Sequence, residues 1–121
     1  MRQIILILLV HFAILNTTRA QSIDDVPLKE INAQYVQLRA EVIPFKNKIS
    51  VNIDYGQSNA MVNIKSNLLK DESGKPMAFN SMIDALNFFM NHNYDLFEVY
   101  TLSTDVSSTP HYILRRKKEE L

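Results

Sequence analysis

The chain has 121 residues, with 13 Lys and Arg against 13 Asp and Glu, and it contains neither cysteine nor tryptophan. The absence of cysteine excludes a disulfide scaffold, a thiolate metal site and a cysteine nucleophile. The balanced charge argues against a strongly basic nucleic-acid-binding protein. A chain of this length is expected to form one small domain.

Residues 1–20 have the three-part pattern of a cleaved secretion signal. Arg2 supplies a positive charge, residues 4–15 are apolar except for His11, and Ala20 precedes the expected cut. The apolar run is shorter than the roughly 20 residues that span a bilayer. We therefore expect a secreted or periplasmic protein with no membrane span and no lipid anchor. Removing 20 of the 121 residues leaves 101, with 11 basic against 13 acidic residues.

The remaining chain is predicted to comprise a leader, one folded domain and a short charged tail at residues 119–121. Residues 21–34 are polar and show no sustained period, which predicts a flexible or loosely docked leader. Strict alternation of apolar and polar residues then predicts strands over residues 35–42 and 49–55, joined as an antiparallel hairpin. Residues 57–70 fit no period clearly and are expected to form a short extended segment.

A helix is predicted from about residue 82 to residue 92. Ser81 and Asp84 resemble a capping box, in which each side chain accepts a hydrogen bond from a free backbone N–H of the first turn. Asn93 suits the left-handed position that often ends a helix. Strands are expected over residues 94–102 and 110–116. The sequence thus predicts an α+β domain over residues 35–118, with an antiparallel sheet of about four strands and one helix packed on one face.

The strand after the helix is apolar on both faces. Simple alternation places Tyr94, Leu96, Tyr100 and Leu102 on one face, with Phe97 and Val99 on the other. Strands of this kind are usually buried on both sides, yet one helix covers only one face, so a second copy of the chain is the expected cover. On the predicted helix, Phe88 lies off the apolar arc that is expected to face the sheet, which comprises Met82, Ile83, Ala85, Leu86, Phe89 and Met90. The candidate interaction surface comprises Phe88, Phe97, Val99, Tyr100 and Tyr112.

Three segments carry a resemblance to known proteins: residues 79–87, residues 94–100 and residues 111–117. Together they resemble small exported bacterial proteins of unknown function. They are also distantly similar to a short domain-of-unknown-function family with a Gly-Trp-Glu-Leu-Val type helix-to-strand turn. Asn93-Tyr94 stands where that family has Gly-Trp. The resemblance covers about residues 35–117 and implies a fold, but it implies no catalytic residue.

No pattern in the sequence predicts catalysis, a cofactor or a metal. His92 and His111 lack the spacing of metal ligands, and no nucleophile–base pattern is present. The basic run at residues 115–118 is followed by two glutamates and is expected to be a solvated tail rather than a nucleic-acid contact.

Three hypotheses follow from the sequence. The first is a non-catalytic binding or assembly module that self-associates or binds another exported protein. The second is a small-ligand or glycan binder that uses Tyr35, Tyr55, Tyr100 and Tyr112. The third is a hydrolase with a site at Asp54, His111 and Glu98, which requires these three groups to meet.

Overall fold

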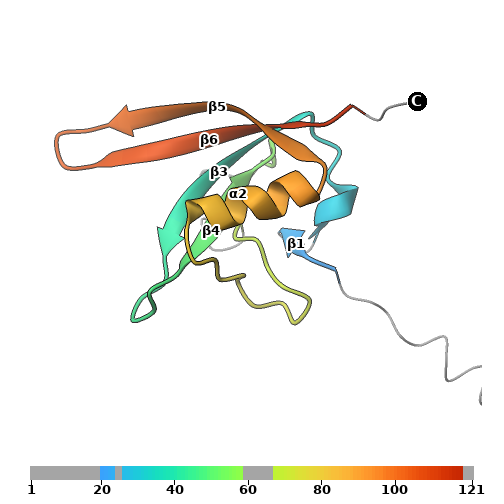
Figure 1. Cartoon of the computed structure of the whole chain (residues 1–121), viewed down its shortest axis with the longest axis horizontal. Coiled ribbons are helices and arrows are strands. Elements are labelled where there is room, and N and C mark those ends of the chain that lie inside the picture. Colours follow the sequence, from blue (N-terminus) through green and yellow to red (C-terminus); the bar gives the residue numbers. More distant parts are fainter. Residues whose placement is uncertain (1–19, 24–25, 59–66, 119–121) are drawn as a thin grey trace, which may run out of the picture.

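The computed structural model describes residues 20–23, 26–58 and 67–118. It contains a four-stranded antiparallel sheet in the order β4-β3-β6-β5, with one helix packed against it (Figure 1). The predicted α+β fold is therefore confirmed. The elements in chain order are β1 (Ser22–Ile23), β2 (Val26–Pro27), the 3-10 helix η2 (Leu28–Glu30), β3 (Tyr35–Val42), β4 (Ile49–Asp54), α2 (Met82–Asn91), β5 (Tyr94–Ser103) and β6 (Ser108–Arg116).

The buried apolar residues of β3 and β4 form the sheet side of the hydrophobic core. Val36 and Leu38 of β3 are buried on the side that faces α2, and Ile53 of β4 lies directly opposite Leu38. Leu114 of β6 lies opposite Val36 on the other side of β3 and is also buried. The predicted hairpin of residues 35–42 and 49–55 is confirmed, since β3 and β4 pair in antiparallel register.

Both predicted ends of the helix are confirmed. At the start, the Ser81 hydroxyl accepts the backbone N–H of Asp84 at 3.3 Å, and the Asp84 carboxylate accepts the backbone N–H of Asn80 at 2.9 Å. At the end, Asn93 has a φ of 72°, the left-handed conformation that asparagine adopts more readily than most residues. The chain reverses there and enters β5.

The helix presents a slightly different face to the sheet than the sequence predicts. Ala85, Leu86 and Phe89 are buried as expected, but Ile83 is 66% exposed. Phe88 is half-buried against Phe79 and Phe89 instead of lying off the packed face. The reason is that Phe79, which precedes the helix, extends the core around one side of α2. A helical projection of α2 alone does not contain that neighbour.

The sequence predicts a flexible or loosely docked leader over residues 21–34, and the structure has the docked alternative. The described part of this segment docks on the domain, with Ile23, Leu28 and Ile31 buried. The backbone of Ser22 bonds in both directions to Lys70 at 3.2 and 2.9 Å, and the Arg116 guanidinium donates to the Ile31 carbonyl. These apolar side chains dock singly and irregularly, so they leave no periodic signal in the sequence.

Several sequence expectations lie outside the described residues: the signal at residues 1–19, most of the extended segment (residues 59–66) and the tail at 119–121. Within the described part of the chain, no helix is long and apolar enough to cross a membrane.

Candidate functional site

Five of the eleven exposed large apolar residues in the described part of the chain lie on β5. Every residue of this strand is exposed except Tyr94, which is 2% exposed in the core. We define the hairpin patch as the exposed apolar residues of β5: Leu96, Phe97, Val99, Tyr100 and Leu102, which are 38–55% exposed. Scattered surface apolar residues are ordinary, but five of them within seven consecutive residues of one strand, on its two faces, make this strand the candidate interaction site.

The hairpin patch is exposed because the β5–β6 hairpin extends beyond the rest of the sheet. β6 pairs with β3 only from Tyr112 to Arg115, whereas β5 and β6 remain paired out to Ser103 and Ser108. Figure 1 shows the outer half of this hairpin extending away from β3, β4 and α2. The turn occupies residues 104–107, so both strands extend further toward it than the predicted ranges 94–102 and 110–116.

A β-bulge decides which way the patch residues face. The register between β5 and β6 shifts between Leu96 and Glu98, so both Phe97 and Glu98 lie opposite Ile113. Beyond the bulge the alternation is inverted relative to the sequence prediction. Val99 lies on the helix side of the sheet, opposite Tyr112, and Tyr100 lies on the outer side, opposite His111.

On the outer side, the aromatic residues are held in place by neighbours. Phe97 contacts Tyr35 edge to face at a ring distance of 5.4 Å, and the Arg115 guanidinium lies 5.2 Å from the Phe97 ring. Tyr100 stacks on His111 at 4.9 Å, and its hydroxyl donates to Gln37 at 2.5 Å. These contacts preorganise the patch, because the rings lose little further freedom when a partner covers them.

The five residues that the sequence proposed for the interaction surface do not all come together. Phe97, Val99 and Tyr100 belong to the hairpin patch. Tyr112 lies opposite Val99, on the helix side, where it is partly buried against the core. Phe88 lies on α2, stacked on His92 at 4.0 Å, and is remote in the fold from the outer hairpin. Sequence reasoning missed Leu96 and Leu102 as site residues, although their place in the doubly apolar strand was a usable signal.

His111 is the one strongly buried ionisable group on the outer face of the hairpin. It is 6% exposed, and its Nδ1 has no hydrogen-bond partner in the part of the chain that the structure describes. Burial lowers the pKa of the His111 imidazole below its ordinary value of 6.5, and the positive charge of Arg39 adds to the effect. The neutral form is therefore favoured in the folded protein.

The carboxylates proposed for hydrolysis do not meet. Asp54 lies opposite Gln37, Gln37 opposite Ile113, and Ile113 opposite Glu98, so Asp54 and Glu98 are on opposite edge strands of the sheet. Three strand spacings separate their backbones by about 14 Å, which is beyond a hydrogen bond or a single bridging water. Among the residues described, no group of three His, Asp or Glu side chains could hold a metal ion.

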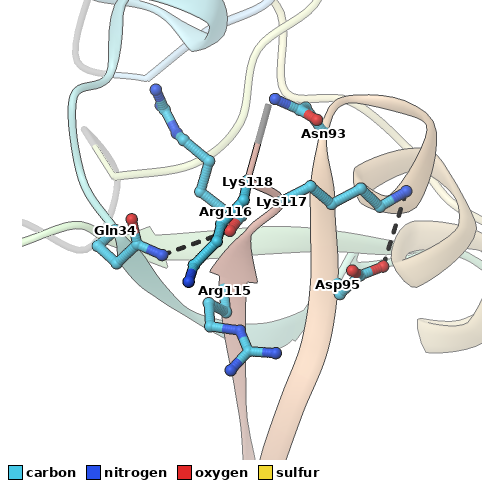
Figure 2. Close-up of a pocket in the computed structure, with 7 residues that line it drawn as sticks. All are labelled: Gln34, Asn93, Asp95, Arg115, Arg116, Lys117 and Lys118. Carbon is cyan, nitrogen blue, oxygen red and sulfur yellow. Dashed lines mark hydrogen bonds and ion pairs between the residues drawn. The ribbon is translucent and has the colours of Figure 1, made fainter. Parts of the chain in front are cut away.

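A hollow of about 650 Å³ at the C-terminal end of β6 is lined by four basic residues, Arg115, Arg116, Lys117 and Lys118 (Figure 2). Three of these four cations have contacts within the chain. Lys117 donates to the Met90 carbonyl at 3.0 Å and lies 3.6 Å from the Asp95 carboxylate. Arg116 donates to the Tyr94 hydroxyl at 3.2 Å, and Arg115 lies over Phe97. Through these contacts the basic residues connect the C-terminal end of α2, the start of β5 and, through Arg116 and Ile31, the N-terminal segment.

No protein-family model, curated protein or solved structure matches this chain.

Proposed function

We propose that the protein is a non-catalytic assembly module that self-associates through the hairpin patch. The observation that supports this is the exposure of five apolar side chains on one strand, with Tyr94 as its only buried residue. Covering such residues removes apolar surface from water, which stabilises a complex by roughly 25 cal/mol for each Å². A cysteine-free domain of this size also gains stability by oligomerising.

The experiment compares two substitutions of exposed apolar residues. Leu102→Lys places a charge in the hairpin patch, where Leu102 is 55% exposed, and Ile83→Lys is the matched control on α2, where Ile83 is 66% exposed. We expect the wild-type protein and Ile83→Lys to associate as concentration rises in sedimentation equilibrium, and Leu102→Lys to remain monomeric. A wild-type protein that stays monomeric at millimolar concentration would refute the proposal. Equal association of the two variants would also refute it.

Binding of a small ligand or glycan through surface tyrosines is the second candidate. Tyr35 and Tyr100 are exposed on the outer face, and the Tyr35–Phe97 pair offers an aromatic surface there. Tyr55 and Tyr112 instead pack against the core, so the aromatic surface is smaller than four tyrosines would make. A glycan that raises the melting temperature of the wild type but not of Tyr35→Ala would favour this candidate, because a ligand stabilises the state that it binds.

The proposal includes the exported location that residues 1–20 suggest. Cell fractionation followed by N-terminal sequencing tests it, with a mature chain that begins near Gln21 as the expected result.

A further inference from the structure

The two edge strands of the main sheet, β4 and β5, differ in whether other described segments pair with their outer backbone groups. The β4 edge is covered, because the Ile53 N–H donates to the Asn67 carbonyl at 2.8 Å and the Leu69 N–H donates to the Val51 carbonyl at 3.0 Å. Ile49 and Phe79 exchange two further backbone bonds along the same edge. At the β5 edge, none of the described segments pairs with the strand beyond β6. Within the described residues, backbone pairing covers the β4 edge and leaves the β5 edge open.

β5 lacks the usual features that protect an open edge. Natural edge strands are commonly blocked by lysine, proline, short length or bulges. β5 runs for ten residues without Lys, Arg or Pro. Its one bulge, at Phe97, lies near the start of the strand and leaves Glu98–Ser103 regular. This segment is a ready template for another strand.

The hairpin turn determines which backbone groups point away from β6. The Thr104 N–H donates to the Ser107 carbonyl at 2.7 Å, so this pair faces inward. Because inward and outward pairs alternate in an antiparallel ladder, the N–H and C=O groups of Val99, Thr101 and Ser103 point outward. Pro110 supports the assignment, since it lies opposite Thr101 and has no N–H to donate at that pair.

We propose that β5 pairs antiparallel with β5 of a second copy about a two-fold axis at Thr101, joining two sheets into one of eight strands. This inference rests on the proposed self-association and names its geometry. The axis places Thr101 opposite Thr101 of the partner subunit and Val99 opposite Ser103 of the partner subunit. Both partners in each of these pairs have outward-facing backbone groups, so the register satisfies the open edge on both copies.

The side chains of β5 are self-complementary in this register. Tyr100 lies across from Leu102 of the partner subunit on the outer face, which is an aromatic–aliphatic pair of the kind that stabilises sheets. Glu98, the only charged residue in the regular part of β5, lies opposite Thr104 of the partner subunit and so avoids its own copy. An unrelated extended peptide would satisfy the same backbone groups, and the test below distinguishes it from a second copy.

Cross-linking tests the axis directly, because the chain has no native cysteine. Thr101→Cys brings two thiols together at a pair whose Cα atoms are about 5.5 Å apart, within the range that a disulfide spans. Val106→Cys is the control: Val106 is 93% exposed in the turn, but its two copies would lie roughly 30 Å apart. Under mild oxidation we expect a disulfide-linked dimer from Thr101→Cys at least tenfold faster than from Val106→Cys. Equal rates would overturn the inference.

A backbone substitution provides the second arm. Thr101→Pro removes one outward N–H without removing a bond to β6, and Thr101→Val retains the N–H as its control. We expect the dissociation constant to rise at least tenfold in Thr101→Pro alone, with circular dichroism confirming that both variants fold.

The outcomes separate the two proposals. If the wild type does not associate, the proposed function fails and the edge pairing fails with it. If it associates and Leu102→Lys does not, but Thr101→Cys fails to cross-link faster than the control, only the edge pairing fails. Copies would then meet through the faces of the hairpin, or the edge would serve another chain.

Discussion

Ile23→Ala distinguishes a docked N-terminal segment from a flexible leader. Ile23 lies in β1 and is 0% exposed. The substitution removes three buried carbon atoms, at about 0.8 kcal/mol each. The cavity that remains adds to this cost, so the free energy of unfolding should fall by about 3 kcal/mol. For a domain of this size, such a loss lowers the melting temperature by roughly 12–24 °C.

The control is the same substitution at an exposed position. Ile83→Ala, on the surface of α2, should change the free energy of unfolding by less than about 0.5 kcal/mol. Urea unfolding followed by far-UV circular dichroism suits a chain without tryptophan. All samples need one protein concentration, because association adds to apparent stability. An Ile23→Ala variant as stable as Ile83→Ala would refute the docking of this segment.

Three further predictions follow from single contacts. In urea unfolding, Ser81→Ala should lower the free energy of unfolding by about 1 kcal/mol, because the N-cap acceptor disappears. Ser81→Asp should retain most of the wild-type stability, and equal losses in the two variants would contradict the capping role. Because φ of residue 93 is 72°, Asn93→Gly should leave the stability unchanged or raise it, and Asn93→Val should lower the free energy of unfolding by about 1–2 kcal/mol. Similar melting temperatures for the two variants would argue against a left-handed residue at this position. Because the pKa of His111 is lowered in the folded state, the unfolded chain binds more protons below pH 6.5, and the free energy of unfolding should fall on acidification from there. His111→Gln should show a shallower fall over that range, and an unchanged slope would show that His111 does not contribute.

The elements that the sequence predicted well are those whose signals are local. Alternation alone locates β3 and β4 almost to the residue, since a half-buried strand repeats every two positions. Ser81 and Asp84 locate the start of α2 for a similar reason, because the cap is made within four residues. Neither inference needs knowledge of what packs above the element.

The elements that the sequence missed depend on contacts between distant segments. Ile23 is buried because β1 meets Lys70, and Phe88 is partly buried because Phe79 lies beside it. The bulge at Phe97 is likewise invisible in β5 itself, since it is a mismatch of register with β6. That mismatch moved Val99 and Tyr100 to faces other than those assigned by simple alternation.

The hairpin patch likewise depends partly on local sequence and partly on contacts between distant segments. The sequence by itself determined that β5 would be apolar on both faces, because side-chain chemistry and a two-residue period are properties of one strand. Only the tertiary structure decided that this strand would lie at the edge of the sheet, next to β6 alone, with no other described segment paired to it. Edge position depends on which segments return to cover which strand. Here residues 67–70 and Phe79 pair with β4, and no described segment other than β6 pairs with β5.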